Sequence, residues 1–115
     1  MVGTEIPKEI IEKVYNLIET AKVSGKIRKG TNEVTKALER GQAKLVAIAS
    51  DVSPQEIVMH LPVIAKEKNI PAVQVTVRSE LGAAAGLDVG TVAVAVVDEG
   101  DAKEQLKQIL EKLKQ

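Results

Sequence analysis

One segment of the chain carries its clearest structural signals: Lys29-Gly30-Thr31-Asn32-Glu33-Val34-Thr35-Lys36-Ala37-Leu38-Glu39-Arg40-Gly41, followed by the apolar run 45–49. A helix is predicted to start here with Thr31 or Asn32 as its N-cap, and Gly41 is predicted to end it. The five apolar residues that follow have the length of a buried strand. A helix that leads directly into a short apolar strand is typical of α/β folds.

Helices and short apolar strands also alternate on both sides of this segment. Apolar residues recur at helical spacing from 10 to 21, which predicts a helix that starts after Pro7 and ends at Ser24-Gly25. Residues 26–29 form a short basic connector or a brief strand. Downstream we expect a helix that starts at the capping box 53–56, kinks or restarts at Pro62 and ends near Asn69. Strands over 71–77 and 91–97, with helices over 79–85 and 101–114, complete a predicted α/β three-layer sandwich.

The composition excludes several classes of function. The chain has 115 residues, one domain's worth, and contains no cysteine, which excludes a disulfide scaffold, a cysteine nucleophile and thiolate zinc sites. His60 is the single histidine, and Tyr15 is the single aromatic residue. RNA-binding modules that stack bases on several aromatic side chains are therefore excluded. The core must be aliphatic.

Catalytic motifs are also missing from the sequence. No phosphate-binding loop and no set of nucleophile, base and oxyanion donors can be assembled, so we predict a protein that is not an enzyme and needs no metal or cofactor. We expect His60 to be a structural histidine with its hydrogen bonds satisfied. Asp98, Glu99 and Asp101 are explained by the start of the last helix, whose dipole favours acids.

The Gly82, Gly86 and Gly90 spacing resembles a membrane dimer motif but more simply predicts a helix end and a tight loop. No apolar run is long enough for a signal peptide or a membrane span. We expect a soluble, cytoplasmic protein without a membrane partner.

The charge is unevenly distributed along the chain. The formal net charge is zero, yet residues 22–44 hold seven basic and two acidic side chains, a local charge of +5. A basic segment on a neutral protein indicates one localised anionic contact. The alternative is a solvated helix face without a ligand.

The predicted helix after Gly30 presents a polar stripe. Helical geometry places Asn32, Lys36 and Arg40 on one face, while Val34, Ala37 and Leu38 can pack inward. The free N–H groups of a helix N-terminus attract phosphates, but Glu33 is unexpected in a pure phosphate site. A glutamate fits if it accepts hydrogen bonds from a guanine edge. A well-capped surface helix is the alternative reading.

The segment 29–46 closely resembles the L7Ae family of archaeal large-subunit ribosomal proteins. The resemblance spans residues 26–100 in order and spacing, and continues through Ile48-Ala49, Asp51-Val52, Glu56-Ile57-Val58, His60-Leu61-Pro62, Ile70-Pro71, Leu81-Gly82 and Ala84-Ala85-Gly86-Leu87. It implies a single-domain α/β/α sandwich with a small mixed β-sheet over residues 1–115. It also implies a protein that binds RNA kink-turns.

A kink-turn is a helix–internal loop–helix with a three-nucleotide bulge and tandem sheared G·A pairs. The resemblance implies that Asn32 and Glu33 read guanine edges of these pairs, and that Lys36 supports them. It implies backbone contact at Gly30, and phosphate contacts at Lys29 and Arg40.

The resemblance implies a second contact, a pocket and loop that hold the flipped-out nucleotide of the bulge. The loop is Leu87 to Thr91, and the pocket positions that match the family are Ile57, Arg78, Val89 and Val92. An unstacked base can be held by apolar contact without an aromatic side chain.

The implied RNA targets are rRNA, box C/D and H/ACA guide RNAs and ribonuclease P RNA. The implied protein partners are a Nop-domain scaffold protein and fibrillarin in the box C/D particle, and the chain alone is expected to be a monomer. The alternative is a protein-interaction module of the same fold that does not bind kink-turns. The Asn32-Glu33-x-x-Lys36 set favours RNA binding, because such a module has no need of it.

The chain departs from the family pattern at three places. Ser53 and Ser50 stand where relatives usually carry acids, and we expect this change to affect how the flipped base is held. Asp88 and Gly90 are expected to shorten and loosen the loop. Residues 71–75 lack the tyrosines of relatives, so we expect this strand to be internal or to face a partner.

Overall fold

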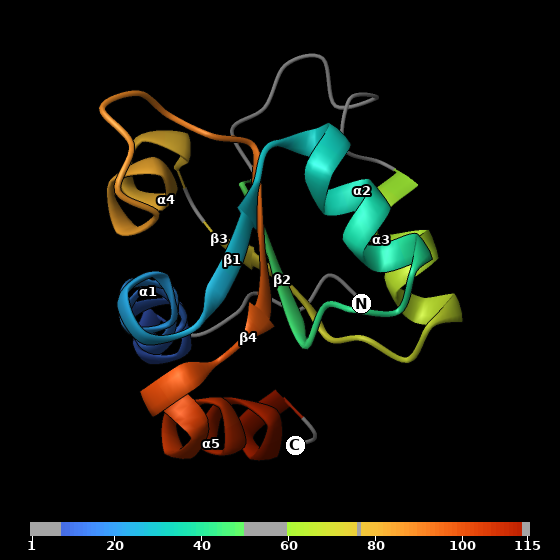
Figure 1. The fold of residues 1–115 in the computed structure, drawn as a ribbon. Coiled ribbons are helices and arrows are strands. Elements are labelled where there is room, and N and C mark those ends of the chain that lie inside the picture. The colour runs from blue at the N-terminus through green and yellow to red at the C-terminus, as the bar shows by residue number, and fades with distance from the viewer. Residues whose placement is uncertain (1–7, 50–59, 76, 114–115) are drawn as a thin grey trace.

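The computed structural model describes residues 8–49, 60–75 and 77–113 (Figure 1). Its elements, in chain order, are α1 (Lys8–Ser24), β1 (Lys26–Lys29), α2 (Thr31–Glu39), β2 (Leu45–Ala49), α3 (His60–Glu67), β3 (Ala72–Val75), α4 (Arg78–Ala84), β4 (Ala93–Asp98), a 3-10 turn (Gly100–Ala102) and α5 (Lys103–Leu113). The capping box 53–56 and the predicted site residue Ile57 lie outside the described residues, as do Ser50 and Ser53.

The described strands form one four-stranded mixed sheet in the order β1-β4-β2-β3. β4 is antiparallel to both β1 and β2, while β2 and β3 are parallel. All five residues of β2 are buried, which is expected of an apolar strand covered on both faces. β3 lies at an edge of the sheet, so the prediction that this strand is internal is wrong. That it faces a partner stays a prediction.

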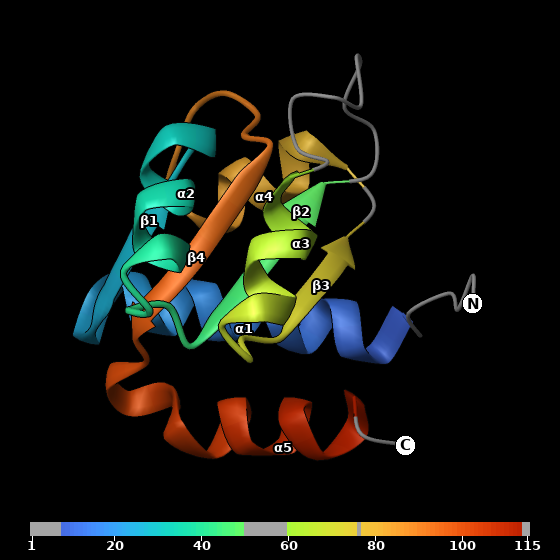
Figure 2. The ribbon, with the colours of Figure 1, turned by 90° about the vertical axis from the view of Figure 1, so that its right-hand side faces the viewer.

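Helices cover both faces of the sheet and confirm the three-layer α/β/α sandwich. α2 and α3 lie on one face, α1 and α4 lie on the other, and α5 packs along α1 at one end (Figures 1 and 2). The core between the layers is aliphatic, and its largest fully buried side chains are those of Leu17, Ile18, Leu38, Leu45, Leu61, Leu81 and Ile109. No helix among the described residues has the length and apolar character that crossing a membrane requires.

Several element boundaries differ from the sequence prediction by one or two residues. β3 ends at Val75, because Val77 is the N-cap of α4 and is not part of the strand. β4 begins at Ala93, two residues later than predicted. The last helix begins as a 3-10 turn at Gly100. The other predicted elements within the described residues have the expected type and order, including the brief strand over 26–29.

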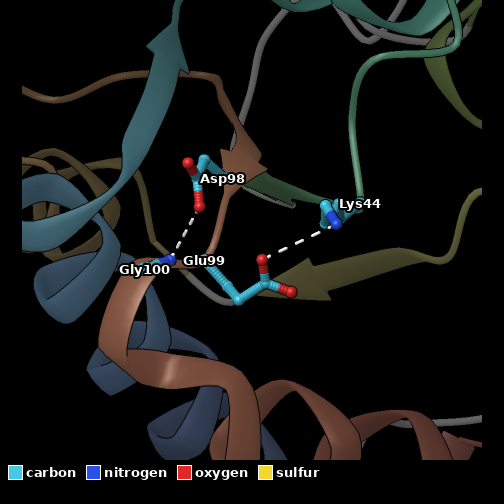
Figure 3. A network of polar contacts seen from close by, with 4 residues as sticks. All are labelled: Lys44, Asp98, Glu99 and Gly100. Carbon is cyan, nitrogen blue, oxygen red and sulfur yellow. Dashed lines mark hydrogen bonds and ion pairs between the residues drawn. The ribbon is translucent and has the colours of Figure 1, made fainter.

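The acidic residues before α5 have specific partners (Figure 3). The Asp98 carboxylate accepts a hydrogen bond of 2.9 Å from the N–H of Gly100, the first residue of the 3-10 turn. Glu99 forms an ion pair with Lys44, with 3.6 Å between Nζ and Oε1. Asp98 therefore makes a local bond at the start of the turn, and Glu99 ties this segment to the residue just before β2.

Candidate nucleic-acid interface

Two segments that are far apart in sequence meet at one end of the sheet. β1 ends where β4 begins, since Lys29 pairs with Val94 in the antiparallel ladder. The Gly30 N–H donates a 3.0 Å hydrogen bond to the Ala93 carbonyl. The first residues of α2 therefore lie next to the end of the loop 87–91, and both are at the upper edge of the molecule in Figure 1.

Gly30 is the N-cap of α2, and its conformation requires glycine. Its φ of 89° and ψ of 155° lie in a region that only glycine occupies readily. No side chain caps the helix, so the prediction that Thr31 or Asn32 is the N-cap is wrong. The Gly30 carbonyl accepts the Val34 N–H at 3.0 Å. Because Asn32 has no capping role, its side chain is available for another partner.

The two faces of α2 are divided as the sequence predicted. Val34, Ala37 and Leu38 are buried in the core. Asn32, Glu33 and Lys36 are exposed, and within the described part of the chain their side chains make no hydrogen bond or ion pair. The first turns of α2 thus present to solvent the amide of Asn32, the carboxylate of Glu33 and the ammonium group of Lys36.

The other basic residues of the predicted site lie at different places around α2. Lys29 is the last residue of β1, directly before the start of the helix, and its side chain is half-buried. Arg40 is the C-cap of α2 and is exposed. It lies roughly 12 Å along the helix axis from Asn32, given a rise of about 1.5 Å per residue. A ligand that contacts both must extend along the whole helix.

A hydroxyl group links the first turns of α2 to α3. The Thr35 Oγ1 donates to the Thr31 carbonyl at 2.7 Å and lies 2.9 Å from the His60 Nε2. With its own hydrogen already used, Thr35 accepts this second bond, so the His60 Nε2 carries a proton. His60 has a hydrogen-bond partner, as predicted, although its side chain is exposed. No sequence pattern revealed this link.

The positions predicted to hold a flipped-out nucleotide differ in their exposure. Val89 is 71% exposed, whereas Leu87 and Val92 are half-buried and pack against the core. Arg78 is exposed at the start of α4. Of the predicted apolar positions that the structure describes, Val89 alone offers most of its side chain to a ligand.

The loop after α4 packs closely against that helix. Gly90 does not adopt a positive φ, and a Cβ atom at this position would lie 3.0 Å from the Arg78 Cβ. The Thr91 N–H donates to the Arg78 carbonyl at 3.2 Å. Gly90 therefore permits close packing of the loop on α4, and the expectation that Asp88 and Gly90 shorten and loosen the loop relative to other family members stays a prediction.

The described residues contain no group of three or more His, Asp or Glu side chains that could hold a metal ion. The exposed polar groups of α2 can donate and accept hydrogen bonds and can hold phosphates.

Comparison with known proteins agrees with this description. The family model described as the ribosomal protein L7Ae/L30e/S12e/Gadd45 family matches residues 12–106. Among solved structures, a Giardia lamblia 15.5kD RNA binding protein is similar to this chain, with 30% sequence identity and a TM-score of 0.89. The alignment covers 95% of this chain and 91% of that protein.

Proposed function

This chain belongs to the ribosomal protein L7Ae/L30e/S12e/Gadd45 family, and on that premise we propose that it binds RNA and recognises kink-turns. The similar Giardia lamblia structure is that of an RNA binding protein, which supports the first part of the proposal. The prediction that the chain is not an enzyme agrees with this family.

The observation that carries the proposal is the free polar set on the first turns of α2. The side chains of Asn32, Glu33 and Lys36 are exposed and have no partners among the described residues. They lie at the N-terminal end of α2, whose N-cap is Gly30. The N–H groups at this end have no intrahelical acceptor and attract phosphate oxygens. Base edges can supply the hydrogen-bond partners that these side chains lack, because Asn32 can both donate and accept a hydrogen bond while the Glu33 carboxylate can only accept.

Glu33 distinguishes base recognition from simple charge attraction. A carboxylate beside RNA repels the phosphates, so a surface that only attracts RNA would be better without it. A guanine edge presents N–H donors that a carboxylate accepts. In the proposal Glu33 and Asn32 read the guanines of the sheared G·A pairs. Lys36 supports these pairs, and its charge, with those of Lys29 and Arg40, holds the backbone.

The same proposal extends to the biological targets. We propose rRNA, box C/D and H/ACA guide RNAs and ribonuclease P RNA as the RNAs that contain the kink-turn, and the Nop-domain scaffold protein and fibrillarin as partners in the box C/D particle. The monomeric state of the free chain and its cytoplasmic location stay predictions.

Glu33→Ala tests the proposal directly. Affinity is measured for a kink-turn RNA and for a matched RNA in which both G·A pairs are replaced by Watson–Crick pairs. We expect the variant to bind the intact kink-turn about 5- to 150-fold more weakly, which corresponds to roughly 1–3 kcal/mol for a specific base contact. The affinity for the disrupted RNA should stay the same or rise slightly.

Glu39→Ala is the matched control, because it removes the same charge from an exposed position at the other end of α2. It should leave both affinities unchanged or slightly improved. Equal or tighter binding of Glu33→Ala to the intact kink-turn would refute base recognition by this residue. Equal affinity of the unmodified protein for both RNAs would refute kink-turn recognition and support the protein-interaction alternative.

A further inference from the structure

The loop 87–91 is attached to α4 at both of its ends. At the first end, Gly86 adopts a φ of +81° and the Leu87 N–H donates to the Gly82 carbonyl at 2.8 Å, an arrangement that closes the helix. At the second end, the Thr91 N–H donates to the Arg78 carbonyl at 3.2 Å. The loop therefore folds back along α4 before the chain enters β4 (Figure 1).

The middle of the loop lies against Gly82. A Cβ atom at this position would overlap the Val89 carbonyl oxygen and would lie 3.0 Å from the Gly90 Cα. Both neighbours are backbone atoms, so a side chain at position 82 cannot be accommodated by a rotamer change. The loop itself would have to move away from α4.

Helix propensity does not explain this glycine. Gly82 lies inside a seven-residue helix and has a helical conformation, where alanine is the better residue. The space that the missing side chain leaves is occupied by the loop backbone. The close approach of the loop is therefore the structural reason for glycine at this position.

The close approach of the loop backbone to Gly82 fixes the position of Val89. The loop backbone is fixed on α4 at three points, and the side chain of Val89 is left 71% exposed. Beyond Thr91, the Ala93 carbonyl accepts the N–H of Gly30. A continuous backbone path therefore connects the position of Val89 to the start of α2.

We propose that Gly82 is a positioning residue for RNA selectivity, because it holds Val89 where an unpaired base beside the α2 contact can pack on it. The inference rests on the proposed function and adds to it the residue that sets the second contact. Gly82 itself is buried and does not touch the RNA.

The test compares two kink-turn RNAs that differ by one base. One has the complete bulge, and in the other the outermost bulged nucleotide is abasic, so that its backbone is kept and only its base is missing. For the unmodified protein, we expect the complete RNA to bind roughly fourfold more tightly or better, which is what burial of about one methyl group provides. In Gly82→Ala this ratio should fall close to one, with the affinity for the abasic RNA unchanged.

Ala83→Ser is the matched control, since it adds one atom at the adjacent, exposed position of α4. It should keep the ratio of the unmodified protein. In the absence of RNA, amide NMR shifts of Gly82→Ala should change at residues 87–91 and stay constant in α2. A variant that is merely less stable would lose affinity for both RNAs by the same factor and would keep the ratio.

Two further variants keep the test decisive if Gly82→Ala does not fold. Val89→Ala removes most of the exposed side chain. Gly90→Ala places a Cβ atom 3.0 Å from the Arg78 Cβ, so it displaces the loop by a smaller distance than Gly82→Ala does. Both should lower the ratio. An unchanged ratio in a folded loop variant would overturn the inference while leaving the proposed function intact. If the unmodified protein binds neither RNA, the proposed function fails, and this inference fails with it.

Discussion

Thr35 joins two helices through a single hydroxyl group. Its oxygen donates to the Thr31 carbonyl at 2.7 Å and accepts from the His60 Nε2 at 2.9 Å. The donor to Thr35 in this contact is the N–H group at the His60 Nε2.

A double-mutant cycle with Thr35→Val and His60→Leu measures the strength of this link. We expect a coupling free energy of about 0.5–1.5 kcal/mol, the usual net contribution of one hydrogen bond, from denaturant unfolding of the four proteins. A coupling free energy near zero would show that the Thr35–His60 bond does not contribute to the stability of the folded protein.

Single residues were predictable where chemistry requires a particular residue type. The exposed set Asn32, Glu33 and Lys36 is visible in the sequence, because polar residues recur on one face of a predicted helix. The Thr35–His60 bond was not predictable, because it joins residues 25 positions apart on two helices whose packing depends on the sheet. Gly82 was noted as part of a glycine spacing and of the family resemblance, but the loop backbone that packs against it was not predicted.

Among the elements, α2 depends most strongly on one backbone conformation. Gly30 is the N-cap at φ 89° and ψ 155°, and among the described residues other than its chain neighbours no heavy atom lies within 4 Å of a Cβ built on it. A side chain there would not clash with these residues, so the cost of replacing this glycine comes from its backbone conformation. An L-residue in this region is unfavourable by roughly 1–3 kcal/mol.

We therefore predict that Gly30→Ala lowers the free energy of unfolding by about 1–3 kcal/mol in chemical denaturation. Gly41→Ala is the matched control, because Gly41 also has open space around it but adopts an ordinary left-handed φ of 66°. That change should cost less, about 1 kcal/mol. Equal stability of Gly30→Ala and the unmodified protein would mean that the start of α2 adopts another conformation in solution.

Element type was easier to predict than element boundaries. The run 45–49 was predicted as a strand with the bounds that β2 has, because five consecutive apolar residues between polar ones leave little choice. The N-cap of α2 was predicted wrongly because Thr31 and Asn32 are good capping residues, whereas the N-cap is Gly30, whose N–H donates to the Ala93 carbonyl. That bond depends on the sheet and is not visible in local sequence.

For the whole molecule, the strand order decides which residues form the candidate site. The order β1-β4-β2-β3 puts the end of β1 beside the start of β4, and so brings the loop 87–91 next to α2. Local patterns predicted the α/β class but contain no information on this order, since it is fixed by pairings between distant segments. The family resemblance, and not periodicity, connected these two segments before the structure was known.

The charge of the whole molecule sets how RNA binding should depend on salt. The protein has no net charge, so attraction must come from the basic segment 22–44, which carries +5. With roughly three to five phosphate contacts, log K should fall with log salt at a slope between about −2 and −5, since each contact contributes about −0.7 to −0.9. Binding measured over a series of KCl concentrations gives this slope.

Two variants locate the source of the slope. Lys36→Gln, on α2, should reduce its magnitude by about one, because it removes one phosphate contact. Lys107→Gln removes the same charge from an exposed position of α5, at the other end of the molecule in Figure 1, and should leave the slope unchanged. If both variants reduced the slope equally, RNA would be attracted by the overall charge of the protein, and the position of the basic residues around α2 would be irrelevant. A slope near −10 would require more phosphate contacts than this segment has cations to provide.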